Sequence, residues 1–145
     1  MAIGTQHIGM TLPVYSATAD AWRLRFFAKS IGETNPIYFD EAAARDAGHP
    51  ALPLPPTFLF SLEFEQPSTA WRDAIGLVSS RILHGEQSFT YHRMAYAGDV
   101  LRFESRIADI YDKKNGALWF IVRETRVTNQ RGEHVADLRG VVVQR

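Results

Sequence analysis

The chain has 145 residues, the length of one domain with room for a sizeable core, and 46% of its residues are hydrophobic, which excludes intrinsic disorder. Its 16 basic residues balance 16 acidic ones, so the charge predicts no binding of nucleic acid or of an anionic membrane surface. The chain has no cysteine, which excludes disulfides, thiolate nucleophiles and cysteine-ligated metals.

Residues 1–17 predict an irregular or strand-like lead-in. They lack the basic region and apolar run that are typical of a signal peptide. No apolar stretch anywhere in the sequence approaches the roughly 20 residues that a membrane helix requires. We therefore expect a cytoplasmic protein that does not enter a membrane.

A first helix is expected over residues 18–30. Thr18 is the expected N-cap, since its hydroxyl can accept a hydrogen bond from a free N–H of the first turn. Trp22, Phe26 and Phe27 follow at helical spacing, and we expect them to form the buried face of this helix.

Two further helical segments follow the first helix. Residues 40–46 predict a short helical turn that Gly48 ends, whereas residues 49–56 contain four prolines and cannot form regular structure. Residues 57–65 are apolar all round, and a helix of that kind must be buried.

From residue 82 onward, apolar and polar side chains alternate with a period of two. Four strands are expected, separated by turns that contain glycine or asparagine: 82–94, 99–111, 117–128 and 133–144. Consecutive strands with short turns form an antiparallel sheet, and the buried helix can lie across it. The predicted fold class is therefore α+β, a curved antiparallel sheet wrapped around a central buried helix in a single domain, 1–145. In that arrangement Phe58, Leu59 and Leu62 should be nearly inaccessible.

The segment Ser30–Asp40 is the most informative part of the sequence. Gly32, Asn35 and Pro36 fit a Gly-Asp-x-Asn-Pro-x-His pattern at the right spacing. Three more segments follow in the matching order: Ala42–Gly48, Pro55–Phe58 and His84–Leu101. Together they resemble the MaoC-like dehydratases and (R)-specific enoyl-CoA hydratases, in particular the FAS1-like N-terminal-domain subgroup. The resemblance implies the hot-dog fold and a substrate that is an acyl-CoA or acyl-carrier thioester, with no cofactor and no metal.

The motif of that family serves the addition of water to an enoyl thioester, or the reverse reaction. A carboxylate and an imidazole hold the water, remove its proton and deliver one to the α-carbon. A backbone N–H at the start of the central helix polarises the thioester carbonyl.

The sequence departs from the family pattern at the reacting positions. Glu33 stands at the aspartate position, and Tyr38 stands at the histidine position, where a phenol with an ordinary pKa of about 10 is a poor base. Pro55 and Pro56 stand where active members carry His-Gly, and proline has no N–H. Thr57 is the next residue that can supply the N–H. These departures resemble the partner subunit of heteromeric dehydratases, in which the neighbouring chain keeps the dyad.

The resemblance implies two sets of site residues. The candidate catalytic residues are Glu33, Tyr38 and His84, and the candidate substrate-binding residues are Asn35, Pro56, Thr57 and Arg93. Each catalytic candidate also has a purely structural interpretation: Glu33 as a loop anchor, Tyr38 as a packing residue, and His84 as a structural histidine. His84, Glu86 and His92 are expected on one face of a strand because of their even spacing. No group of His, Asp and Glu has metal-ligand spacing, so no metal site is expected.

Three functions remain open at this point. The leading one is a 3-hydroxyacyl-thioester dehydratase or enoyl-CoA hydratase component, either as the subunit without the dyad or with a rewired site that uses Glu33. The second is a hot-dog thioesterase, which would need an acidic residue near the start of the central helix, where the first is Glu63. The third is a non-enzymatic acyl-thioester-binding subunit. An open sheet edge predicts a homodimer, or a heterodimer with a MaoC-like catalytic subunit.

Overall fold

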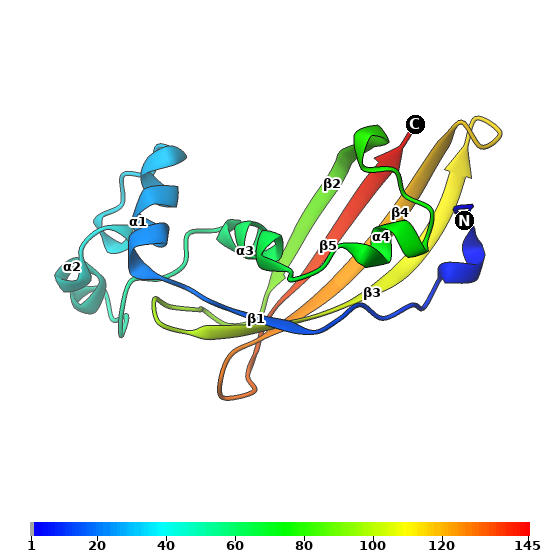
Figure 1. Ribbon diagram of the computed structural model, residues 1–145. Helices are drawn as coiled ribbons and strands as arrows, with labels where there is room; N and C mark the ends of the chain where they lie inside the picture. Colours follow the sequence, from blue (N-terminus) through cyan, green and yellow to red (C-terminus); the bar gives the residue numbers. More distant parts are fainter. Residues whose placement is uncertain (1) are drawn as a thin grey trace.

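The computed structural model describes residues 2–145 (Figure 1), so Met1 of the predicted lead-in lies outside the described residues. The strands and α-helices are β1 (Tyr15–Thr18), α1 (Ala21–Ser30), α2 (Glu41–Asp46), α3 (Phe58–Leu62), α4 (Ala70–Ala74), β2 (Ile82–Tyr91), β3 (Val100–Lys113), β4 (Leu118–Thr128) and β5 (His134–Gln144). Short 3-10 helices are η1 (Thr5–His7), η2 (Pro36–Tyr38), η3 (Glu63–Glu65) and η4 (Ser79–Arg81). No helix within residues 2–145 is long and apolar enough to cross a membrane.

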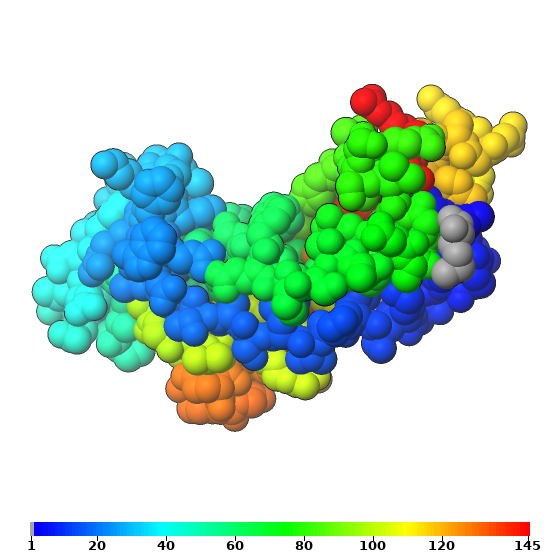
Figure 2. Space-filling model, viewed as in Figure 1, coloured from blue at the N-terminus to red at the C-terminus, as the bar shows by residue number. Residues whose placement is uncertain are grey.

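The described strands form one five-stranded antiparallel sheet in the order β1-β3-β4-β5-β2. The long strands β3, β4 and β5 lie in the middle, and β2 and the short β1 lie at the edges. Helices α3 and α4 cover one face, while α1 and α2 extend beyond the end of the sheet (Figure 1). The space-filling view shows α3 and α4 as a green layer beside the blue and cyan region of α1 and α2 (Figure 2). The predicted α+β architecture and its four C-terminal strands are confirmed.

The central helix is buried as the sequence predicts. Phe58 and Leu59 are each 2% exposed and Leu62 is fully buried, in one core cluster with residues of β1, β3, β4 and β5. Burial of each such side chain contributes about 1.5–3 kcal/mol. The α-helix is short, and η3 continues it as a 3-10 turn to Glu65.

Helix α4 was not expected from the sequence. It buries Trp71 against the half of the sheet that α3 does not cover, in a second core cluster with Ile107, Ile110 and Ile121. Its five residues are too few to show a clear helical period, and for this reason sequence reasoning missed it.

The expected N-cap of the first helix is wrong by two residues. Thr18 is the last residue of β1, where it pairs with Val100 of β3. The helix begins at Ala21, and Asp20 holds the N-cap position in extended conformation. Strand pairing with β3 therefore outweighs the local capping preference of Thr18.

The expected buried face of α1 is also wrong. Leu24 and Ala28 are fully buried, while Trp22 and Phe26 are each 68% exposed. Phe27 is partly buried and meets the Phe58 ring edge-on, with centroids 5.2 Å apart. Both i, i+4 pairs fit a helical period, and the smaller pair faces inward, where Leu24 joins the core cluster of Phe58 and Leu59.

A β-bulge at Gly85 changes which face of the sheet each side chain of β2 occupies. His84 and Glu86 pair with two consecutive residues of β5, so Gly85 is the extra residue. His84 consequently lies on the helix side, where its ring stacks on Phe60 at 5.1 Å between centroids. The expectation that His84, Glu86 and His92 share a face is wrong, because even spacing holds only along an unbroken ladder.

Candidate active site at the start of the central helix

A cavity of about 380 Å³ opens at the N-terminus of α3. It lies between η2, the proline-rich segment, α3 and the end of β2. Its lining residues are Tyr38, Leu54, Pro55, Pro56, Leu59, Tyr91, His92, Arg93, Met94, Ala95 and Val135. The fold thus brings the predicted site residues Tyr38, Pro56 and Arg93 to one cavity. Arg93 forms an ion pair with Glu133 at 2.9 Å.

Thr57 holds an unusual backbone conformation at the start of α3. Its φ of 75° is in the left-handed region, which a β-branched residue rarely adopts. Its backbone N–H donates a hydrogen bond of 2.9 Å to the Tyr91 hydroxyl oxygen. Tyr91, at the end of β2, therefore accepts the N–H that the sequence predicts as the contact of a thioester carbonyl.

Tyr91 is a site residue that sequence reasoning missed. Burial raises the pKa of its phenol, although the hydrogen bond from Thr57 lowers it, and the net shift is upward. The side chain is therefore a neutral hydroxyl at physiological pH. The signal that could have found it is the alternation Phe89-x-Tyr91, which places both rings on the helix side of the sheet, 5.9 Å apart.

The residues at the dyad positions have separate roles. One Glu33 carboxylate oxygen accepts the N–H groups of Thr34 and Asn35 at 2.8 and 2.9 Å, so it anchors its own loop. The Asn35 side chain caps η2 by accepting the N–H of Ile37 at 3.2 Å. Tyr38 alone reaches the cavity, and burial, with the nearby Glu33 charge second, raises the pKa of its phenol. Tyr38 is therefore protonated at neutral pH and cannot act as a base there.

His84 lies in a different cavity, of about 200 Å³, between α3, α4 and the sheet. That cavity also contains a buried ion pair between Arg123 of β4 and Glu63, whose side chain is 6% exposed. Burial raises the pKa of Glu63, while the Arg123 guanidinium lowers it, and burial has the larger effect. The structure therefore does not bring His84 to Tyr38. The acidic residue that a thioesterase would require is held by Arg123.

The opposite face of the sheet is strongly polar. An open depression of about 660 Å³ lies there among charged side chains of β3, β4 and β5, including Glu104, Arg106 and Arg139. His92, His134 and Asp137, the last of which lines this depression, form a group with one ligand atom of each within 4.8 Å of the others. Of the residues described, this is the group that could hold a metal, although the sequence spacing predicted none.

Comparison with known proteins gives the family. A family model for the FAS1-like dehydratase domain region matches residues 6–138. The chain belongs to this family. It is 40% identical over 114 residues to a UPF0336 protein of Streptomyces coelicolor, an alignment that spans 78% of this chain and 75% of the relative.

Solved structures agree with that assignment. One chain of the C-terminally truncated HadBC (3R-hydroxyacyl-ACP dehydratase) complex of Mycobacterium tuberculosis has a TM-score of 0.81 and 26% identity, covering 94% of this chain and 96% of that one. A MaoC-like dehydratase from Rhodospirillum rubrum has a TM-score of 0.73 and 21% identity, covering 94% and 91%, and this match shows the fold alone. The MaoC-like resemblance and the hot-dog fold are confirmed.

Proposed function

We propose that this chain is the subunit of a heteromeric 3-hydroxyacyl-thioester dehydratase or enoyl-thioester hydratase that binds the acyl thioester without supplying the catalytic dyad. The observation that carries the proposal is a contrast at the start of α3. The Thr57 backbone N–H donates there to an exchangeable hydroxyl, that of Tyr91. By contrast, Glu33 anchors its own loop and does not line the cavity, and Tyr38, which does, is protonated. A MaoC-like partner would contribute the carboxylate and the imidazole.

Thr57 is the expected contact of the thioester carbonyl. A backbone N–H at a helix start aims both a donor and the positive end of the helix dipole at the ligand. The Tyr91 hydroxyl accepts this N–H, and a carbonyl oxygen would replace it. The mostly apolar walls, with Leu54, Leu59 and Met94, suit an acyl chain.

Two surface features support a dimer. Strand β2 lies at the sheet edge and pairs only with β5, so one row of its backbone N–H and C=O groups is free for a second chain. Trp22 and Phe26 on α1 are each 68% exposed, and Phe64 on η3 is 74% exposed. Ordered aromatic side chains with this exposure are typical of protein interfaces.

The activity test uses the full chain alone and co-purified with a MaoC-like subunit that has the intact motif. We expect little or no hydration of crotonyl-CoA by the chain alone, because loss of a general base typically costs 10²–10⁴-fold. In the complex, Glu33→Gln should leave activity largely intact, as should the control Glu41→Gln on the exposed surface of α2. Robust turnover by the chain alone that Glu33→Gln abolishes would contradict the proposal and favour a rewired site.

The binding test measures the affinity of the complex for crotonyl-CoA. Tyr91→Phe removes the hydroxyl that competes for the Thr57 N–H, and a neutral hydrogen bond contributes about 0.5–1.5 kcal/mol. We therefore expect binding to tighten by about 2- to 10-fold. Tyr96→Phe is the matched control, since the Tyr96 hydroxyl contacts His49 Nδ1 instead, at 3.2 Å. Unchanged binding in Tyr91→Phe would rule out Thr57 as the carbonyl contact.

A further inference from the structure

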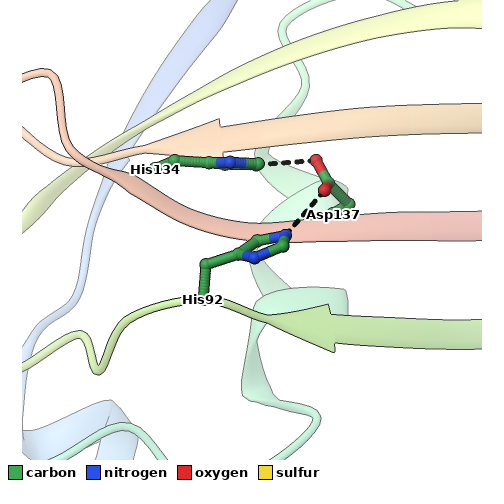
Figure 3. A group of neighbouring side chains, drawn as sticks. All are labelled: His92, His134 and Asp137. Atoms are coloured by element: carbon green, nitrogen blue, oxygen red, sulfur yellow. Dashed lines mark hydrogen bonds and ion pairs between the residues drawn. The ribbon is translucent and has the colours of Figure 1, made fainter.

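Two histidines and an aspartate converge on the sheet face that is opposite the helices (Figure 3). His92 follows the last residue of β2, while His134 and Asp137 belong to β5. The His92 Nε2 atom lies 2.8 Å from one carboxylate oxygen of Asp137, and the His134 Nε2 atom lies 2.7 Å from the other. The two imidazole rings stack with centroids 4.2 Å apart.

Backbone structure fixes this arrangement. Residues three apart on a regular strand point to opposite faces, but Val135 is the extra residue of a β-bulge, so His134 and Asp137 share a face. His92 is tied to the same bulge, since its N–H donates to the Val135 carbonyl at 2.8 Å. The three side chains therefore come from adjacent, hydrogen-bonded segments and need little rearrangement to meet one ligand.

The donor set and its access suit a transition metal ion. Two imidazole nitrogens and a carboxylate oxygen are ligands that zinc binds at roughly 2.0–2.2 Å, and water commonly fills the fourth position. The side chains of His92, His134 and Asp137 are 41%, 31% and 48% exposed, which leaves a solvent-facing side for water. We propose that His92, His134 and Asp137 bind one zinc ion.

The surrounding charge sets the expected strength of this site. Zinc would bind through Nε2 of each imidazole and so take the place of the two hydrogen bonds to Asp137. Arg126 is the cross-strand partner of Asp137 and opposes a second positive charge. Binding should therefore be weaker than at a closed structural zinc site.

The proposed zinc site lies next to the thioester cavity, but zinc binding there does not depend on the proposed function. His92 and Arg93 line the cavity at the start of α3. Zinc would hold the end of β2 against β5 and so stabilise this wall of the cavity. The metal can accordingly be tested without any activity assay.

The test is calorimetric titration of tag-free, metal-stripped full chain with zinc chloride. We expect saturable binding of one zinc per chain, and none for magnesium, which prefers an all-oxygen set of ligands. Asp137→Asn and His134→Ala should each weaken binding by more than 10-fold. The control His7→Ala, in η1 and away from the cluster, should bind as the unmodified chain does.

A second measurement does not depend on the folding of the variants. Of the five histidines in the chain, only the ring resonances of His92 and His134 should shift on zinc titration by NMR. Absence of saturable binding to the unmodified chain, or binding that survives both substitutions, would overturn the proposal. In that case the hydrogen bonds of the cluster serve only to connect the end of β2 to β5.

Discussion

Replacement of Arg123 by methionine should destabilise the protein, and the size of the effect should depend on pH. Arg123 forms the ion pair with Glu63 inside the smaller cavity, and the Glu63 side chain is 6% exposed. Methionine keeps much of the aliphatic volume of arginine but removes the charge. The substitution leaves a buried carboxylate without a partner, and loss of one partner from a buried pair typically costs about 3–5 kcal/mol.

Protonation of Glu63 limits that cost. The ordinary pKa of its carboxyl is 4.5. At 1.36 kcal/mol per pH unit, the free-energy cost of protonating this group is about 3 kcal/mol at pH 7 and less than about 1 kcal/mol at pH 5. Burial already raises the pKa of Glu63 in the unmodified protein, so part of this cost is present before the substitution. A pKa of Glu63 that is higher in the folded than in the unfolded state stabilises the folded protein at low pH. This stabilisation is fully present below the unfolded pKa and is lost as the pH rises through the folded pKa. We therefore expect Arg123→Met to cost about 1–3 kcal/mol at pH 7 and below 1 kcal/mol at pH 5.

The assay is urea unfolding of both proteins at pH 7 and pH 5, at one fixed protein concentration because association contributes to apparent stability. Arg126→Met is the matched control, since Arg126 lies on the same strand but is exposed on the opposite face. It should change the free energy of unfolding by no more than about 0.5 kcal/mol at either pH. Equal destabilisation by Arg123→Met at the two pH values would refute the reasoning.

Three further predictions concern stability, each measurable by chemical denaturation. Gly85→Ala should cost about 1–3 kcal/mol, since an added Cβ would lie 2.9 Å from a methyl group of Val143, and an unchanged midpoint would argue against the bulge. Thr57→Gly should stabilise by up to about 1 kcal/mol, because glycine relieves the left-handed strain, whereas Thr57→Ala keeps that strain and should not stabilise. Leu62→Ala should cost about 2–5 kcal/mol, and a cost below about 0.5 kcal/mol would mean that α3 is not buried.

The fold could be predicted largely from the sequence because its signals are local. The period-two alternation after residue 82 and the turns at Gly98, Asn115 and Gly132 locate the four long strands to within a few residues, and the glycines there have positive φ. The apolar run after Pro56 predicts the buried helix in the same way. What failed depends on contacts between distant segments, such as the choice of the buried face of α1, which packing against α3 decides.

Two of the β-bulges in the sheet explain most of what the sequence could not predict about the site. Each inserts one residue into a ladder and reverses the alternation beyond it, at Gly85 in β2 and at Val135 in β5. The first sends His84 to the helix side, away from the face of His92. The second brings His134 onto the face of Asp137. A bulge leaves little trace in the hydrophobic pattern, so a histidine cluster formed across two strands was invisible from spacing alone.

The proposed division of labour between subunits follows from where each part of the site resides. Glu33 and Tyr38 lie on a loop and a 3-10 turn at the rim of the structure, so side chains there can change at little cost to the core. The donor at Thr57 is a backbone group at the start of a buried helix, and any non-proline residue at that position keeps it. Substitution can therefore remove the acid and base while the carbonyl contact persists. Under the proposed function, a chain of this kind would still bind a thioester without the dyad, and the paired activity and binding experiments measure these two properties separately.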